Sequence, residues 1–228
     1  MSDRITAQVA VAGARGFDCN TKLTHAHALR FLEHGYTFAI RYVGRATAHS
    51  YDLTPHEASA IVTAGLGCMI VQHVQRDGPP WWTPTDDKGK QYGATAAAQA
   101  HTCGYPPGAT VWLDLEGIAP STDPERVISY ANLWHEAVAA AGYLPGVYIG
   151  YGARLSAQQF YERLHFTRYW AAFNLNADEY PAVRGVCMRQ HRAHAPAGVP
   201  FQIDADVVQA DNLGGLPALA AIEQRLPG

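Results

Sequence analysis

Two acidic side chains stand two residues apart in the apolar run Val-Trp-Leu-Asp-Leu-Glu, at positions 114 and 116. Alternate residues of a β-strand share a face, so Trp112, Asp114 and Glu116 are predicted to point one way and the residues between them the other. Charged groups rarely project unpaired into a packed core. We therefore expect Asp114 and Glu116 at the carboxyl end of a strand, opening into a cleft.

Two further acids lie near opposite ends of the chain. Asp18 ends the run Gly-Phe-Asp, and Asp204 stands with Asp206 in the run Gln-Ile-Asp-Ala-Asp at 202–206, where the acids are expected at the end of an apolar run. The first and last strands of a closed barrel are neighbours, so Asp18, Asp204 and the central pair would converge. So dense a group cannot be fully ionised, and at least one carboxyl group is expected to have a raised pKa.

Such a group of acids suits a particular chemistry. A carboxylic acid that keeps its proton near neutral pH can protonate a leaving oxygen, while an ionised neighbour stabilises the developing oxocarbenium charge. Cleavage of a glycosidic bond uses this pairing. In the alternative, an aspartate at a strand end caps the next helix or pairs with an arginine, which fits Asp114 with Glu116 least well.

Trp81 and Trp82 belong to a long segment, Arg76 to Pro84, between a predicted strand and a predicted helix. The loop that follows a barrel strand lies on the rim where that strand ends. Tryptophans exposed there would stack on sugar rings. The alternative is that one of the two folds back over the top of the barrel.

Eight apolar runs are predicted as strands and supply the frame for these residues. The first five alternate with helices, whereas short segments rich in Pro, Gly and Ala separate the last three. The predicted fold is α/β, an irregular TIM-like barrel of five β/α units followed by three strands, (β/α)5(β)3, in one domain spanning residues 1–228. The strands are Val9–Asp18, Thr37–Val43, Gly67–Val74, Thr110–Glu116, Gly146–Gly150, Tyr169–Phe173, Val186–His191 and Gln202–Val207.

Capping residues predict helix starts at Thr24, Thr54, Asp123 and Ser156. The helix capped by Thr54 has a proline at its first position and ends before Gly65. The other predicted helices are His25–His34, about Tyr92–His101, Pro124–Ala141, a helix after Ser156 that ends near Leu164, and a closing helix at about Leu216–Arg225.

The composition excludes several classes of partner. The net charge of −3 comes from 17 basic and 20 acidic side chains without charged blocks, which gives nucleic acid no electrostatic attraction. The chain has neither a run of 18 apolar residues nor a basic start followed by an apolar core, so we expect a protein made in the cytoplasm without a signal peptide or membrane span. Four widely spaced cysteines predict free thiols, and scattered histidines predict no metal or other cofactor. We expect a monomer.

Together these motifs resemble the glycoside hydrolase-like family known as domain of unknown function 1906, which is related to the family 25 glycoside hydrolases, the lysozymes. A barrel of five β/α units and three strands is also that family's architecture. Six short motifs carry the resemblance, in the same order, from Gly16 to about Val208. They are Gly-Phe-Asp at 16–18, Arg-Tyr-Val at 41–43, Leu-Asp-Leu-Glu at 113–116, Tyr148 in Gly-Val-Tyr-Ile-Gly, Tyr-Trp-Ala-Ala at 169–172 and Ile-Asp at 203–204.

The resemblance implies roles for the acids. Glu116 corresponds to the proton donor, Asp114 to the acid that supports the reacting centre, and Asp18 and Asp204 to further acids of the site. In the family 25 lysozymes the bond that is cut follows N-acetylmuramic acid in peptidoglycan, and the substrate's N-acetyl group is a proposed nucleophile. The residues expected to bind substrate are Arg41, Tyr148, Trp170, Gln190 and Asp206, with Trp81 and Trp82 on the rim.

The chain departs from the lysozymes at two places. Residues 188–191 read Met-Arg-Gln-His where a Trp-Gln-Tyr pattern is usual, and Asp206 replaces an asparagine. Three functions are therefore expected in turn: a glycosidase directed at bacterial peptidoglycan, a catalytically inactive glycan-binding module, and a metal-dependent hydrolase that uses the acidic cluster. Without a signal peptide, a wall-directed enzyme would leave the cell through phage lysis or specialised secretion.

Overall fold

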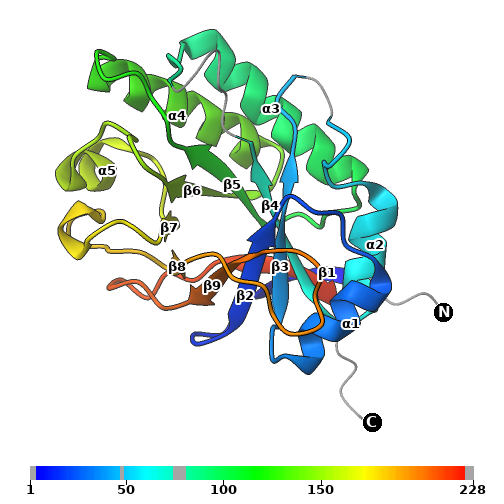
Figure 1. The fold of residues 1–228 in the computed structure, drawn as a ribbon. Helices are drawn as coiled ribbons and strands as arrows, with labels where there is room; N and C mark the ends of the chain where they lie inside the picture. The colour runs from blue at the N-terminus through cyan, green and yellow to red at the C-terminus, as the bar shows by residue number, and fades with distance from the viewer. Residues whose placement is uncertain (1–3, 47–48, 74–80, 224–228) are drawn as a thin grey trace.

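The computed structural model describes residues 4–46, 49–73 and 81–223. Strands and five α-helices alternate through its first two thirds, and Figure 1 shows the helices on the outside of the strands. The strands are β1 (Ile5–Val9), β2 (Arg15–Cys19), β3 (Phe38–Val43), β4 (Gly67–Gln72), β5 (Thr110–Leu115), β6 (Leu144–Ile149), β7 (Tyr169–Ala171), β8 (Met188–Gln190), β9 (Asp204–Val208) and β10 (Ala218–Ile222). The helices are α1 (His25–Glu33), α2 (Pro55–Thr63), α3 (Asp86–Thr102), α4 (Pro124–Ala140) and α5 (Ala157–Arg163).

Eight of these strands close into a barrel in the order β4-β3-β2-β9-β8-β7-β6-β5, with β5 pairing back onto β4. Helices follow β2 to β6, while β7, β8 and β9 are joined by loops and the short 3₁₀ turn η1 (Ala177–Glu179). The α/β class and the irregular TIM-like barrel of five β/α units followed by three strands are confirmed.

The directions of the strands bring Asp18, near the start of the chain, next to Asp204, near its end. Strands β2 to β8 run parallel to their neighbours, but β9 is antiparallel to both β8 and β2. The amino end of β9 therefore lies at the rim where the parallel strands have their carboxyl ends. Asp204, the first residue of β9, pairs in register with Asp18 of β2.

The helix starts follow local capping. Thr24, Thr54, Asp123 and Ser156 each accept a hydrogen bond from a backbone N–H in the first turn of the helix that follows. The predicted start of α3 at Tyr92 was too late, because this helix begins at Asp86 behind the cap Thr85.

The glycines that weaken the helical signal in this part of α3 permit its packing. A Cβ atom at Gly89 would lie 2.5 Å from the carbonyl oxygen of Tyr130, and one at Gly93 would lie 2.6 Å from that of Trp134. Both carbonyls belong to α4, so only glycine lets the two helices approach this closely.

Two predictions at the chain ends were wrong. The closing helix at Leu216–Arg225 is instead the strand β10, which pairs antiparallel with β1 over five residue pairs and contacts β4 at Ala220. Leucine and alanine favour a helix locally, but pairing with two strands overrides that preference. The first predicted strand, Val9–Asp18, is divided by a turn, so that Val9 ends β1 and Arg15 begins β2.

The barrel has apolar side chains on both sides of its wall. The interior is filled below the rim by Phe38, Ile40, Met69, Val71, Trp112, Trp170, Cys187, Met188 and Val208. Glycines on the inner face make room for the largest rings, since a Cβ atom at Gly146 would lie 2.3 Å from Trp112 and one at Gly16 would lie 2.1 Å from Phe38. This packed interior leaves only the upper end of the barrel for polar groups.

The four cysteines are free and buried, as predicted. Within the described residues, none of the helices is long and apolar enough to cross a membrane.

Candidate active site

Five carboxyl groups gather at the rim, on the inward face of strands β2, β5 and β9 or directly after them. Asp18, Asp114 and Asp206 are buried, with between 1% and 7% of each residue exposed, whereas Glu116 and Asp204 are half-buried. The charges of Asp18, Asp114, Glu116 and Asp206 all act on the Tyr148 side chain, and the charge of Asp204 acts on Asp18 and Asp206. The structure thus brings together the four predicted acids and adds Asp206 to them.

A chain of hydrogen bonds holds Asp18 in place. The Tyr42 hydroxyl donates to Oδ1 of Asp18 at 2.8 Å, and Nε2 of Gln190 donates to Oδ2 at 2.8 Å. Gln190 in turn accepts a hydrogen bond of 2.9 Å from the Tyr148 hydroxyl. Residues on three other strands, β3, β6 and β8, therefore position one buried carboxyl group of β2.

Asp206 lies deeper and is held by Trp170, whose Nε1 donates to Oδ1 of the aspartate at 2.8 Å. Trp170 is 1% exposed and its ring lies 4.4 Å from that of Tyr148. The structure therefore places Trp170 in the floor beneath the acids, where it supports Asp206 and Tyr148 instead of presenting a surface for stacking.

Burial raises the pKa values of three of these acids. The pKa of Asp18 is raised to about 7, mainly by burial, against the opposing hydrogen bond from Gln190 and with a further increase from the charge of Asp204. Burial and the neighbouring charge of Asp18 hold the pKa of Asp206 well above its ordinary value. The pKa of Asp204 is also raised by burial. The expectation that at least one carboxyl group has a raised pKa is confirmed.

Glu116 follows β5 and is held by the segment after β6. The N–H of Gly117 donates to the carbonyl of Tyr151 at 2.8 Å, and that of Ile118 donates to Gly152 at 3.1 Å. A Cβ atom at Gly150 would lie 2.5 Å from both Cβ and Oε2 of Glu116, so glycine is needed there to leave room for the glutamate. The side chain thus has a defined place beyond the end of its strand.

The two tryptophans of the rim segment differ in burial and in their contacts. Trp82 is 2% exposed, packs edge-on against Tyr130 and donates a hydrogen bond of 2.7 Å from Nε1 to the carbonyl of Glu116. It supports Glu116 from below, which matches the alternative that one tryptophan folds back. Trp81 is only half-buried and lies 6.1 Å from the ring of Tyr151, while residues 74–80 of this segment fall outside the described part of the chain.

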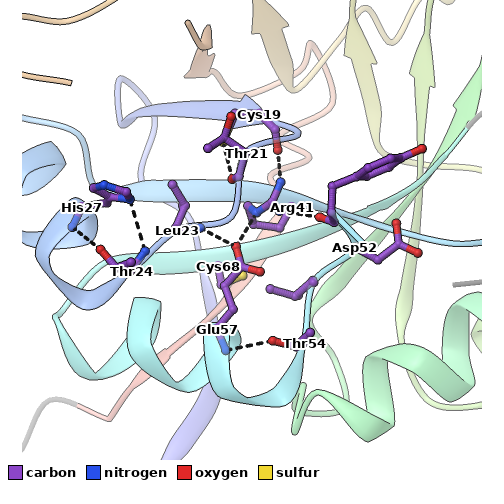
Figure 2. A network of polar contacts seen from close by, with 12 residues as sticks. Cys19, Thr21, Leu23, Thr24, His27, Arg41, Asp52, Thr54, Glu57 and Cys68 are labelled. Carbon is purple, nitrogen blue, oxygen red and sulfur yellow. Dashed lines mark hydrogen bonds and ion pairs between the residues drawn. The ribbon is translucent and has the colours of Figure 1, made fainter. Parts of the chain in front are cut away.

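Arg41 does not lie with the acids. It points to the helix side of β3, where its Nε donates to Oε1 of Glu57 at 2.7 Å and its Nη2 to the carbonyl of Tyr51 at 2.9 Å. Figure 2 shows this network, in which the guanidinium also contacts the carbonyl of Cys19, and the N–H of Leu23 donates to the same glutamate oxygen. The substrate-binding role predicted for Arg41 is therefore replaced by a structural one.

Sequence reasoning overlooked Tyr42, which follows Arg41 and points inward. Its ring stacks at 4.5 Å on His73, whose Nε2 lies 3.2 Å from Oδ1 of the buried Asp52. Burial lowers the pKa of His73 to about 4, so this histidine is neutral at pH 7. Barrel strands are buried on both faces, and hydrophobic alternation therefore gave no signal to distinguish the inward tyrosine from the outward arginine.

The structure offers no basis for a metal centre in the residues it describes. Within residues 4–46, 49–73 and 81–223, no three His, Cys, Asp or Glu side chains are grouped so as to hold a metal ion. We therefore assign no metal ligands.

Comparisons with known proteins agree with this barrel. The chain is similar to the Tat-secreted protein Rv2525c of Mycobacterium tuberculosis, solved with L-tartrate, with a TM-score of 0.61 and 15% identity over 87% of this chain and 96% of the other. It is similar to the catalytic domain of endolysin ply40 from bacteriophage P40 of Listeria monocytogenes, with a TM-score of 0.60 and 12% identity over 87% and 94% of the two chains. A lysozyme from Streptomyces coelicolor matches with a TM-score of 0.53 and 13% identity over 87% and 93%.

At these identities the structural matches establish a shared fold. No curated protein sequence matches the chain. The model of a family described as Rv2525c-like, glycoside hydrolase-like domain matches residues 28–208. The chain therefore belongs to the Rv2525c-like, glycoside hydrolase-like family, and the expected relationship to lysozyme-like barrels is confirmed.

Proposed function

We propose that this protein is a peptidoglycan-directed glycoside hydrolase that cleaves the glycan by carboxylate acid/base chemistry. One observation carries the proposal: Asp114 and Glu116 meet Asp18 and Asp204 at the open end of a glycoside hydrolase-like barrel. Burial raises the pKa of Asp18 to about 7 and the pKa of Asp204 above its ordinary value, which suits proton transfer near neutral pH.

In this proposal Glu116 is the proton donor. It is half-buried, whereas Asp114 is buried, and the backbone contacts of Gly117 and Ile118 hold it at the entrance. It would protonate the leaving oxygen as the glycosidic bond breaks, and ionised carboxylates below it would stabilise the oxocarbenium charge. The buried Asp114 would support the reacting centre, where either the substrate's N-acetyl group or a water molecule attacks the sugar carbon.

The remaining residues position this pair. Tyr42, Gln190 and Tyr148 keep Asp18 at one place by hydrogen bonds, so its charge is directed at a fixed point. The proposed substrate is the glycan of the bacterial cell wall, which is supported by the likeness to an endolysin and a lysozyme. Such a substrate lies outside the cytoplasmic membrane, so we also propose release through lysis or a specialised secretion route.

Incubation with purified peptidoglycan tests the proposal. We expect new reducing ends from the wild-type protein and from Glu125→Gln, a surface variant of α4, and a loss of turnover of roughly 10²–10⁴-fold in Glu116→Gln. A known muramidase serves as the positive control. The proposal fails if the wild type produces no reducing ends, and the role of Glu116 fails if its glutamine variant stays fully active.

A second candidate, a catalytically inactive glycan-binding module, has one observation in its favour. Both oxygens of Asp18 already accept hydrogen bonds from Tyr42 and Gln190, so this carboxyl group is occupied before any substrate arrives. Binding of peptidoglycan that survives Glu116→Gln, without turnover by the wild type, would favour this function.

A further inference from the structure

A groove of about 560 Å³ opens beside Glu116 and plays no part in the chemistry described above. One wall is the segment from Gly150 to Ala157, between β6 and α5, and the other is the segment after β7 that includes η1. Figure 1 shows this second segment, in yellow, next to α5 at the left of the barrel. Gly150 is both the start of the groove and the residue that makes room for Glu116.

The inner end of the groove is positively charged. Arg154 is half-buried, donates from Nε to the carbonyl of Ile118 at 3.0 Å, and lies with its guanidinium 5.2 Å from the centre of the Trp81 ring. Its backbone has a φ of 64°, a conformation that residues other than glycine rarely adopt. With Nε used on the backbone, the Nη groups are the ones that would meet a ligand.

The outer end of the groove is negatively charged. Asp178 and Glu179 line it from η1 and are exposed. Glu179 already accepts hydrogen bonds from the backbone and side-chain nitrogens of Asn176, so Asp178 is the acid better placed to receive a ligand cation. The groove thus presents a cation that contacts Ile118, two residues after Glu116, and an anion on η1, in the segment after β7.

We propose that this groove binds a short peptide substituent of the glycan, with a peptide carboxylate at Arg154 and a side-chain ammonium group at Asp178. This inference rests on the proposed function for the glycan that carries the peptide. A peptide-free glycan has no ammonium group for Asp178, and its carboxylate lies on the muramic acid itself, without the spacing that would let one ligand use both ends of the groove. The charge order in the groove instead matches an acidic peptide residue near the sugar followed by a residue with an amino group.

Binding of a soluble disaccharide that ends in N-acetylmuramic acid, with and without such a peptide, tests the groove independently of turnover, because no glycosidic bond follows the N-acetylmuramic acid. Calorimetric titration is expected to show about tenfold tighter binding of the peptide-bearing form, and Arg154→Gln should remove most of that gain. Asp178→Asn should weaken binding of the free-amine peptide and leave that of the N-acetylated peptide unchanged. Arg163→Gln and Asp87→Asn, which remove the same charges outside the groove, should change neither affinity.

Several results would overturn the proposal: equal affinity for the two disaccharides, no binding of either, or equal losses in the groove and control variants. Asp178 is exposed on a 3₁₀ turn, so its variant tests the groove even if Arg154→Gln fails to fold. The two proposals fail separately. A peptide preference in binding without cleavage of peptidoglycan rejects the hydrolase alone, and cleavage of peptide-free and peptide-bearing glycan at equal kcat/KM without a binding preference rejects the groove alone.

Discussion

Two buried polar networks lie on opposite faces of β2 and β3. On the helix side, Arg41 and Glu57 form an ion pair with 0% and 4% of their side chains exposed. On the barrel side, Asp18 is 1% exposed and is bound by Tyr42 and Gln190. Arg41 and Tyr42 are neighbours on one strand. Arg41 therefore belongs to the outer network around Glu57, and Tyr42 belongs to the inner network around Asp18.

The two networks differ in whether their charged groups are paired with groups of opposite charge. The outer network matches one cation with one anion and joins them to backbone groups of the loops after β2 and β3, so it orders the structure (Figure 2). The inner network collects acids without an arginine or lysine among the hydrogen bonds to Asp18, and burial raises the pKa values of Asp18 and Asp206. Like charges held together in this way are typical of a site that transfers protons.

A glutamate-to-glutamine substitution in the outer network and one at the entrance to the acidic site should have different effects. Glu57→Gln leaves the buried Arg41 without its counter-ion, and we expect a loss of about 3–5 kcal/mol in the free energy of unfolding. Glu116→Gln lies at the half-buried entrance and should change stability little while abolishing turnover. Urea unfolding followed by circular dichroism measures both. A small effect of Glu57→Gln would contradict the structural role of the ion pair.

Asp18→Asn should change how stability depends on pH. Between its ordinary pKa of 3.8 and its raised pKa of about 7, folded Asp18 holds a proton that the unfolded chain has released, so stability falls as pH rises. Asparagine cannot lose this proton, and the variant should gain relative to the wild type across that window, by at most about 4 kcal/mol.

Urea midpoints measured from pH 4 to pH 8 would show this widening difference. His73, with its lowered pKa of about 4, gives a slope of the opposite sign in both proteins, so the difference between them is the informative quantity. Asp87→Asn on the surface of α3 serves as the matched control. A constant difference between Asp18→Asn and the wild type would show that Asp18 is ionised throughout.

The smallest effect is expected at the rim. Trp81 is half-buried beside Tyr151 and Arg154, and its replacement by alanine removes an aromatic face next to these two residues. We expect glycan binding to weaken by about 1 kcal/mol, roughly fivefold, with kcat nearly unchanged. Titration with a soluble glycan fragment measures the loss. A large drop in kcat instead would show that Trp81, like Trp82, helps to position Glu116.

Much of the fold followed from local signals. Caps at Thr24, Thr54, Asp123 and Ser156 predicted four helix starts, because a side-chain oxygen satisfies the first N–H groups wherever the helix lies. The closing segment had no such cap, and its apolar residues fit a helix or a strand equally well. Its pairing with β1, more than 200 residues away, decided the outcome.

The candidate site was likewise determined at two levels. Strand alternation by itself placed Asp114 and Glu116 on one face, since side chains alternate along any strand. The sequence could not tell Arg41 from Tyr42, because both faces of a barrel strand are buried, and it gave no reason for β9 to run antiparallel. Only the tertiary structure brought Asp204 beside Asp18, placed Asp206 against Trp170 and raised their pKa values, because burial and neighbouring charge arise when distant strands close the barrel.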